Sequence, residues 1–331
     1  MGLPPADSTR AVIIGSERVV YGYDDSSEHL QFSELVEEAA MVFKMAADPT
    51  VGWVVDKFPL LRHLPSWFPG ASFQRNAATY RNIARRLIDE PFQESVRKIQ
   101  SASCAPCLVS SAIDENPGLF KDSEELEAVK NTAASAYVGM HISVSVICSL
   151  FLAMVLHPDA QKRAQREIDA VTGRTRFPTI ADRKDLPFID CIIKEVMRWS
   201  PPAPFSFPHV QSQGMLSEGG MFIPEGCIII VNLWAIFRDE IQYPQPNQFI
   251  PERYLDADVL DPMSCSFGYG RRLCPGIHIV DSWIWIMFAN LLATLDISCP
   301  VNPDTNEEIR PKVAFTNERI RYCTFNSLTL Y

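Results

Sequence analysis

The sequence lacks three features that would each assign it to a broad class of protein. It has no Lys/Arg-rich run, and its 30 basic residues against 40 acidic ones give a net charge of −10, which argues against a nucleic-acid-binding protein. The start, MGLPPADSTR, carries no basic segment followed by an apolar one, so we expect no secretory leader. It has no window of about 18 uninterrupted apolar residues, so we expect no membrane span in this chain.

A disulfide framework is also missing from the pattern. Nine cysteines are an odd number, scattered widely over 331 residues, and this favours free thiols in a reducing compartment. Only CAPC, from Cys104 to Cys107, has the spacing of a metal-binding pair. No second Cys or His pair lies nearby in the sequence, so a structural role is favoured for these two residues.

What is present predicts a helix-rich globular protein with a minor β portion. Hydrophobic spacing predicts helices over residues 28–47, 74–101, 123–157, 158–172, 186–199 and 275–294. Ser123 is expected to cap the third of these helices, and residues 208–232 are expected to form short strands broken by turns at EGG and PEG. The segment RAVIIGSERVVYGY, residues 10–23, has a strand-like pattern.

The stretch SFGYGRRLCPGIHIV, residues 266–280, carries the strongest chemical signal. Cys274 comes just before an apolar helix, so its sulfur is expected to face unpaired N–H groups and the positive end of the helix dipole, which stabilise a thiolate. Arg272 offers a rigid fork suited to a carboxylate, and the glycines let the backbone pass close to a flat group. An iron porphyrin with propionate arms needs these features together.

Written as F-x-x-G-x-R-x-C-x-G, the stretch has a pattern that a chain this long matches by chance with odds on the order of one in ten thousand. Its fixed positions are Phe267, Gly270, Arg272, Cys274 and Gly276. The pattern resembles the haem-binding signature of the cytochrome P450 family, the haem-thiolate monooxygenases. The resemblance implies that the cofactor is haem b, that the five residues form its binding loop, and that Cys274 is the metal ligand. It also implies that Arg272 binds a propionate.

Two further segments are similar to the family, in the order in which the family has them. Glu195 and Arg198 lie three residues apart in IKEVMRWSPP and therefore on one helix face, and FIPERYL supplies Arg253. The resemblance implies that these three side chains form a structural salt-bridge network that supports the haem-side loop. His209, in FPHV, falls where the family often has a second propionate partner.

One segment departs from the family pattern, on the helix that in the family crosses the open face of the haem. In VGMHIS, Gly139 is present, but His141 takes the place of an acidic residue and Ile142 that of a threonine. The acid–alcohol pair helps to deliver protons to dioxygen, and isoleucine has no hydroxyl. Ser143 points about 100° further around the helix, although ordered water could relay protons instead. These four residues are the candidates for the catalytic group.

The resemblance implies a mainly α cytochrome P450 fold with a small β portion, as one haem-thiolate domain over residues 1–331 that lacks the family's N-terminal part. In the family, the N-terminal part carries a membrane anchor, some of the sheet, and a propionate-binding Trp-x-x-x-Arg motif, so the resemblance implies that this chain lacks all three. Trp234 and Arg238 have that spacing but stand in another context. An incompletely assigned gene start and a shortened protein explain this equally well.

We expect an enzyme that oxidises an apolar organic small molecule with dioxygen, of the type found in fungal secondary metabolism. No nicotinamide or flavin motif occurs in the sequence, so electrons are expected from a separate NADPH-dependent diflavin reductase. We expect an intracellular location, in the cytoplasm or peripherally at the endoplasmic reticulum surface. Two alternatives stay open: a haem-dependent isomerase or dehydratase without oxygen activation, and a non-catalytic truncated paralogue.

Overall fold

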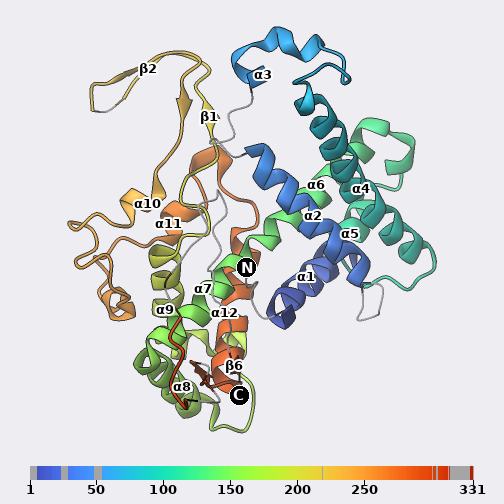
Figure 1. The fold of residues 1–331 in the computed structure, drawn as a ribbon. Coiled ribbons are helices and arrows are strands. Elements are labelled where there is room, and N and C mark those ends of the chain that lie inside the picture. The colour runs from blue at the N-terminus through green and yellow to red at the C-terminus, as the bar shows by residue number, and fades with distance from the viewer. Residues whose placement is uncertain are drawn as a thin grey trace. The chain divides into compact units, whose positions relative to one another are not determined.

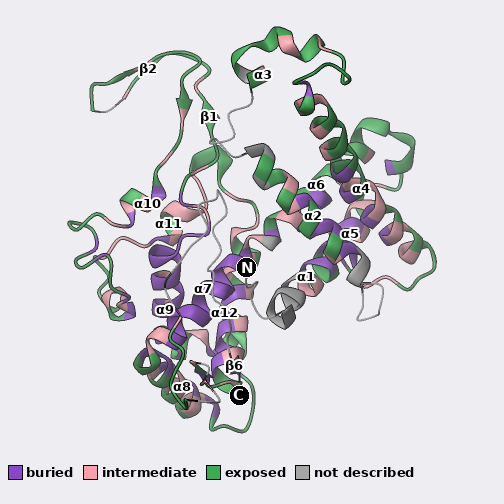
Figure 2. Ribbon diagram, viewed as in Figure 1, coloured by how far each residue is buried: buried purple, intermediate pink, exposed green. Residues whose placement is uncertain are grey.

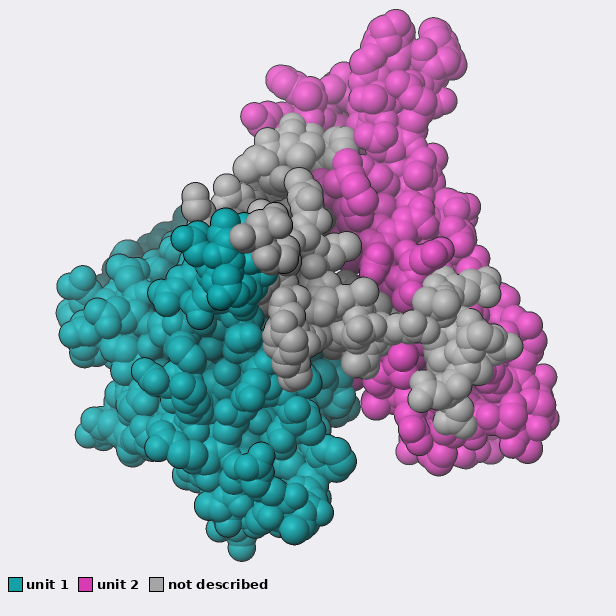
Figure 3. Space-filling view, turned by 60° about the horizontal axis from the view of Figure 1, so that its bottom comes forward, with its two compact units in different colours: residues 1–4, 145–331 teal, residues 5–144 magenta. Residues whose placement is uncertain are grey.

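The structure is a computed structural model that describes residues 6–23, 29–47, 54–217, 219–299, 301–302, 305–311, 313 and 329–330. Helices dominate it, with short two-stranded ribbons (Figure 1). The chain divides into two compact units, one of Pro5–Val144 and one of Ser145–Tyr331 with Met1–Pro4 (Figure 3). The interpretation of residues 1–331 as one haem domain stays a prediction.

The unit Pro5–Val144 is built from helices around an aromatic core. Its α-helices are α1 (Ala6–Tyr21), α2 (His29–Ala47), α3 (Val54–Lys57), α4 (Ser72–Gln100), α5 (Leu108–Glu115) and α6 (Ser123–His141). Helix α2 packs against α4, and α1 against α6. The rings of Tyr21 and Tyr137 meet edge to face at 5.5 Å, and the Tyr137 hydroxyl donates a 2.6 Å hydrogen bond to the buried Glu17 carboxylate. This bond satisfies a carboxylate that would otherwise be costly to bury.

The strand expected over residues 10–23 is wrong, because helix α1 covers this segment to Tyr21. In its described part, residues 16–17 are buried, 18–19 are exposed and 20–21 are buried again. This repeat follows the turn of a helix, whereas a strand would alternate residue by residue.

The long helix expected over residues 123–157 is interrupted by a turn at Ile142. Helix α6 ends at His141, and α7 (Ser143–Leu156) begins directly after the turn. The Ile142 N–H donates to the Gly139 carbonyl at 3.3 Å, a bond to the third residue back that tightens the chain locally. The turn therefore falls within the candidate catalytic segment.

The sequence pattern predicts Ser123 as the N-cap of α6, but the N-cap in the structure is Asp122. Its carboxylate accepts hydrogen bonds from the backbone N–H groups of Glu124 at 2.9 Å and Glu125 at 3.1 Å. These bonds satisfy two of the N–H groups that a helix start leaves without a partner.

The second unit holds the remaining helices and the β ribbons. Besides α7, its helices are α8 (Pro158–Thr172), α9 (Pro187–Trp199), α10 (Leu233–Ile236), α11 (Met263–Ser266) and α12 (Ile277–Thr294). Helix α9 packs against α8, α12 and the 3₁₀ turn η4 (Pro251–Leu255). The buried residues of this unit are concentrated in α7 and α9 (Figure 2). The helices predicted over 158–172, 186–199 and 275–294 are confirmed.

The expected strands are present as short antiparallel ribbons. Strand β1 (His209–Val210) pairs with β4 (Ile228–Ile229), and β2 (Met215–Leu216) pairs with β3 (Phe222–Ile223). Near the C-terminus β5 (Ile297–Ser298) pairs with β6 (Thr329–Leu330). The predicted minor β portion is thus confirmed.

Within the described residues, two apolar helical stretches are long enough to cross a membrane by length and composition alone. The stretch Ser123–Leu156, formed by α6 and α7, has a mean hydropathy of 2.1 over its most apolar part, which is 82% buried. Helix α12 has a mean hydropathy of 1.4 over its most apolar part, and 28% of that part is buried. Burial of the first stretch is what a core helix of a globular protein shows. The absence of a membrane span stays a prediction.

Candidate functional site

A fully buried ion pair on α9 forms the centre of a polar cluster. Proline at position 187 starts α9, and the prolines after Ser200 prevent its continuation, so Glu195 and Arg198 lie in its last two turns. The Arg198 Nε donates to Glu195 Oε2 at 2.8 Å, and Arg198 Nη2 donates to Glu195 Oε1 at 2.8 Å. Both side chains are 0% exposed. Two parallel charged bonds are the strongest form of this pair.

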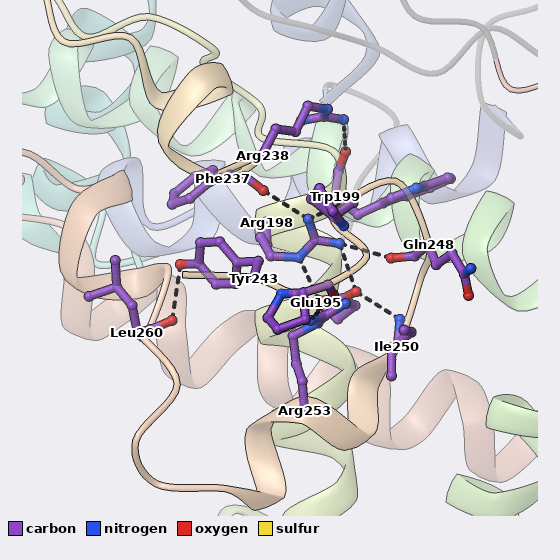
Figure 4. Close-up of polar contacts among 12 residues, drawn as sticks. Glu195, Arg198, Trp199, Phe237, Arg238, Tyr243, Gln248, Ile250, Arg253 and Leu260 are labelled. Atoms are coloured by element: carbon purple, nitrogen blue, oxygen red, sulfur yellow. Dashed lines mark hydrogen bonds and ion pairs between the residues drawn. The ribbon is translucent and has the colours of Figure 1, made fainter. Parts of the chain in front are cut away.

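Backbone groups of a long following loop complete the cluster (Figure 4). Arg198 donates from Nη1 to the carbonyls of Phe237 at 2.9 Å and Pro246 at 2.7 Å, and from Nη2 to that of Gln248 at 3.0 Å. The Ile250 N–H donates to Glu195 Oε1 at 2.7 Å. The sequence pattern did not identify these partners, because a carbonyl oxygen carries no residue-type signal.

Arg253, on η4, joins the cluster from the other side. Its Nε lies 3.2 Å from Glu195 Oε2, which makes an ion pair without hydrogen-bond alignment, and its Nη1 donates to the Pro244 carbonyl at 2.9 Å. The structure therefore brings Glu195, Arg198 and Arg253 together around one carboxylate. The cluster fixes the loop to α9.

The cysteine-bearing loop runs from α11 to the start of α12 and is closed by its own backbone. The Cys274 N–H donates to the Phe267 carbonyl at 2.8 Å, which brings the two ends of the loop together. Gly268 has φ +85°, and a Cβ at this position would lie 3.1 Å from the Arg272 carbonyl oxygen. Only glycine adopts this conformation without strain. Gly276, with φ −82°, takes an angle open to any residue.

The first turn of α12 begins slightly later than the sequence suggests. Gly276 is the N-cap and Ile277 the first helical residue, and the Ile277 N–H donates to the Cys274 carbonyl at 3.3 Å. Cys274 is half-buried, with its sulfur 3.8 Å from the place where a Cβ of Gly276 would stand. The Arg272 guanidinium is exposed, and Gly270 has φ +56°.

The donor set of this loop fits a haem. In the part of the chain that the structure describes, no group of three or more His, Cys, Asp or Glu side chains could hold a bare metal ion. A porphyrin supplies four nitrogen ligands itself and needs one axial ligand from the protein, which a single thiol provides. Leu273 is 46% exposed and Ile279 is 49% exposed, so apolar surface flanks the thiol and the guanidinium. An apolar macrocycle with anionic arms requires this combination.

His209 lies on β1 with its ring exposed. Its Nδ1 is 2.7 Å from the Phe207 carbonyl oxygen, a contact in which the ring nitrogen must be the donor. In the neutral ring the proton is then on Nδ1, and Nε2 is left as an acceptor.

The candidate catalytic residues occupy the junction of α6 and α7. Gly139 is exposed in the last turn of α6, Ile142 forms the turn half-buried, and Ser143 is 3% exposed at the start of α7. The side chain of His141 lies outside the described residues. The hydroxyl nearest in sequence to the expected alcohol is therefore that of a buried serine.

The Trp234 and Arg238 pair is engaged within the protein. The Arg238 guanidinium stacks over the Trp234 ring at 3.0 Å from its centroid, and Nη2 donates to the Trp199 carbonyl at 3.1 Å. These contacts attach α10 to the end of α9.

Comparison with known proteins identifies the family. The sequence profile described as Cytochrome P450 matches residues 9–324. The chain belongs to the cytochrome P450 family. A cytochrome P450 structure from zebra fish, with progesterone, has a TM-score of 0.74 and 25% identity, and the match covers 98% of this chain and 70% of that one. The α-rich cytochrome P450 fold predicted from the sequence is confirmed, and the family implies a haem cofactor.

Named fungal relatives are similar over most of this chain. Cytochrome P450 monooxygenase 136 of Postia placenta is 36% identical over 313 residues, which are 92% of this chain and 58% of the relative. Cytochrome P450 monooxygenase claR of Ampulloclitocybe clavipes is 37% identical over 311 residues, 92% of this chain and 57% of the relative. The chain thus spans less than two thirds of the length of these fungal cytochromes P450, and the prediction of a fungal member is confirmed.

Proposed function

We propose that the protein is a haem-thiolate monooxygenase that uses haem b to oxidise an apolar organic small molecule of fungal secondary metabolism. The observation that carries the proposal is the loop from Phe267 to Gly276, which holds a single thiol beside an exposed guanidinium and apolar surface. Relatives that are named monooxygenases support it. The proposed partners are dioxygen and an NADPH-dependent diflavin reductase.

The residues of the loop have separate roles. Cys274 Sγ would bind the haem iron, and Arg272 and His209 would hold the propionates. Bound haem supplies dioxygen activation, favoured by electron donation from a thiolate ligand. The buried cluster of Glu195, Arg198 and Arg253 holds the loop that follows α9 to this helix, and this would support the cysteine-bearing segment further along the chain.

Proton delivery differs from the family pattern at two positions, His141 and Ile142. Ile142 has no hydroxyl, so the side chain at this position neither holds nor transfers a proton. The Ser143 hydroxyl and ordered water are the groups left to relay protons at this junction. We therefore expect oxygenation that is slow and loosely coupled to electron supply.

The proposal is tested by a carbon monoxide difference spectrum of the reduced protein after supply of haem. The wild type is expected to show the red-shifted Soret band of thiolate ligation, and Cys274→Ala is expected to lose it. Cys265→Ala is the matched control, because Cys265 lies half-buried at the other end of the same loop and should leave the band in place. A band that persists in Cys274→Ala, or a folded wild type that binds no haem, overturns the proposal.

A further inference from the structure

Cys104 and Cys107 lie side by side in the unit Pro5–Val144, on the segment between α4 and α5. Their sulfur atoms are 3.9 Å apart, and both cysteines are free. Cys104 is half-buried and Cys107 is buried. The proposed monooxygenase chemistry uses neither residue, so their close approach needs its own explanation.

The end of α1 leaves space for this pair. Gly22 has φ +73°, and a Cβ at this position would overlap the Cys104 sulfur and lie 3.1 Å from the Cys107 sulfur. The Ala105 N–H donates to the Gly22 carbonyl at 3.2 Å and so holds the segment against this glycine. The absence of a side chain at Gly22 allows the two sulfurs to face each other.

The two thiols have different surroundings. Cys107 is the N-cap of α5, and its sulfur accepts the Ser110 N–H at 3.2 Å, so this sulfur has a hydrogen-bond donor at the start of the helix. The Cys104 sulfur contacts the carbonyl oxygens of Ala105 at 3.2 Å and Tyr21 at 3.6 Å, which favour the protonated thiol. Burial, with Cys107 adding to it, raises the pKa of Cys104 to about 11. Cys104 is the half-buried sulfur that solvent reaches, and Cys107 is the buried sulfur beside it that can resolve a mixed disulfide.

Metal binding is not the best use of this pair. A structural zinc site needs about four ligands, and in the described ranges no third His, Cys, Asp or Glu joins these two sulfurs. Two adjacent thiols without further ligands are instead suited to a disulfide, whose sulfurs are about 2.05 Å apart. The distance of 3.9 Å closes by rotation of the Cys104 side chain away from the carbonyl oxygens.

We propose that Cys104 and Cys107 form a dithiol–disulfide couple that exchanges with small-molecule disulfides such as oxidised glutathione. The Cys104 thiol first loses its proton to water, and the small fraction of thiolate so formed attacks one glutathione sulfur, forms a mixed disulfide and releases one glutathione thiolate. The Cys107 thiolate then attacks the Cys104 sulfur, forms the internal disulfide and releases the second glutathione. The protein loses two electrons and two protons, and one oxidised glutathione becomes two reduced ones.

The test uses the full-length protein equilibrated in buffers of increasing ratio of oxidised to reduced glutathione. After acid quenching and alkylation of free thiols with N-ethylmaleimide, trypsin cuts after Lys98 and Lys121 and yields residues 99–121, whose only cysteines are this pair. As the ratio increases, this peptide is expected to lose both alkyl groups and two hydrogens. Exposed Cys227, which lacks a neighbouring thiol in the described structure, is the internal standard and should form only a mixed glutathione disulfide.

Two single variants separate the steps. Cys107→Ser is expected to stop at a mixed disulfide on Cys104, with at least about ten times more glutathione on this peptide than in the wild type. Cys104→Ser removes the sulfur that solvent reaches and should leave Cys107 alkylated. The proposal is overturned if the wild-type peptide keeps both alkyl groups at ratios that fully modify Cys227. A persistent mixed disulfide in the wild type overturns it equally.

Discussion

At the residue scale, the Glu195 carboxylate is the charge on which the buried cluster depends. It faces Arg198 and Arg253, and all three side chains are at most 6% exposed. We expect Glu195→Gln to destabilise the protein by about 3–5 kcal/mol, because it leaves two buried cations without a compensating charge. The measurement is the urea dependence of unfolding followed by circular dichroism.

The control for this variant is an exposed ion pair on a helix. Arg86 and Glu90 are also joined by a side-chain hydrogen bond, at 2.9 Å, but solvent reaches both of them. Glu90→Gln should leave the midpoint of unfolding nearly unchanged, since exposed pairs contribute little. Equal effects of the two variants would show that burial does not control the energetics of this cluster.

Ile142 is the residue whose chemistry departs most clearly from the family pattern. Ile142→Thr introduces a hydroxyl at the turn between α6 and α7, and we expect it to increase product formed per dioxygen consumed by about tenfold or more. The assay uses the protein with a diflavin reductase and any substrate that the wild type oxidises. Ile142→Val is the matched control, because valine has the shape of threonine without its hydroxyl. An equal gain in both variants would assign the effect to side-chain size.

At the scale of elements, His157 marks the junction of α7 and α8. It is the N-cap of α8, and its ring stacks on that of Phe249 with 4.9 Å between centroids. Burial lowers its pKa below the ordinary value, and the Glu195 carboxylate partly opposes that shift. The unfolded chain therefore binds a proton more readily than the folded one as the pH falls below about 6.5. This histidine should cost stability in acid and none at neutral pH.

The test compares wild type with His157→Phe, which keeps the stacking and removes the titration. Between about pH 7.5 and pH 5.5, the free energy of unfolding should fall further in the wild type than in the variant. Carboxylates titrate equally in both proteins, so the difference isolates the histidine. Parallel pH dependences would show that the ring takes up its proton without cost in the folded state.

The elements also show where sequence patterns are sufficient. Proline and the apolar period placed α8, α9 and α12 to within about two residues, because these signals act locally. The pattern of residues 10–23 was misread as strand, since an isolated apolar run does not say which neighbours will bury it. No proline lies at the turn at Ile142, and Gly139 is part of helix α6, so the sequence does not indicate this interruption.

The candidate site shows the same limit. The spacing of Glu195 and Arg198 placed both on one helix face, and the loop motif placed Cys274 before α12. The carbonyl oxygens that accept the hydrogen bonds of Arg198 come from a loop about 40–50 residues further along the chain. Every residue has a carbonyl, so no residue type in the sequence indicates them. The closeness of Cys104, Cys107 and Gly22 likewise depends on tertiary packing.

At the scale of the whole molecule, the division into two compact units was not predictable from composition. Both units are helical and apolar inside, so no shift in pattern marks the boundary near residue 144. The net charge of −10 is a property of the entire chain, and the absence of nucleic-acid binding stays a prediction.

Neither unit carries a dinucleotide fingerprint. The nearest candidate, GYGRRL, lacks the third glycine and forms the 3₁₀ turn η5 (Gly270–Arg272) after α11, where a Rossmann fold has a strand and a helix. We therefore expect NADPH alone to leave the haem-loaded protein oxidised. Addition of a diflavin reductase should speed formation of the carbon monoxide band at least about tenfold. Because this readout follows reduction and not product, it needs no substrate. Reduction by NADPH without the reductase would show that the chain itself holds an electron-accepting site for the nucleotide.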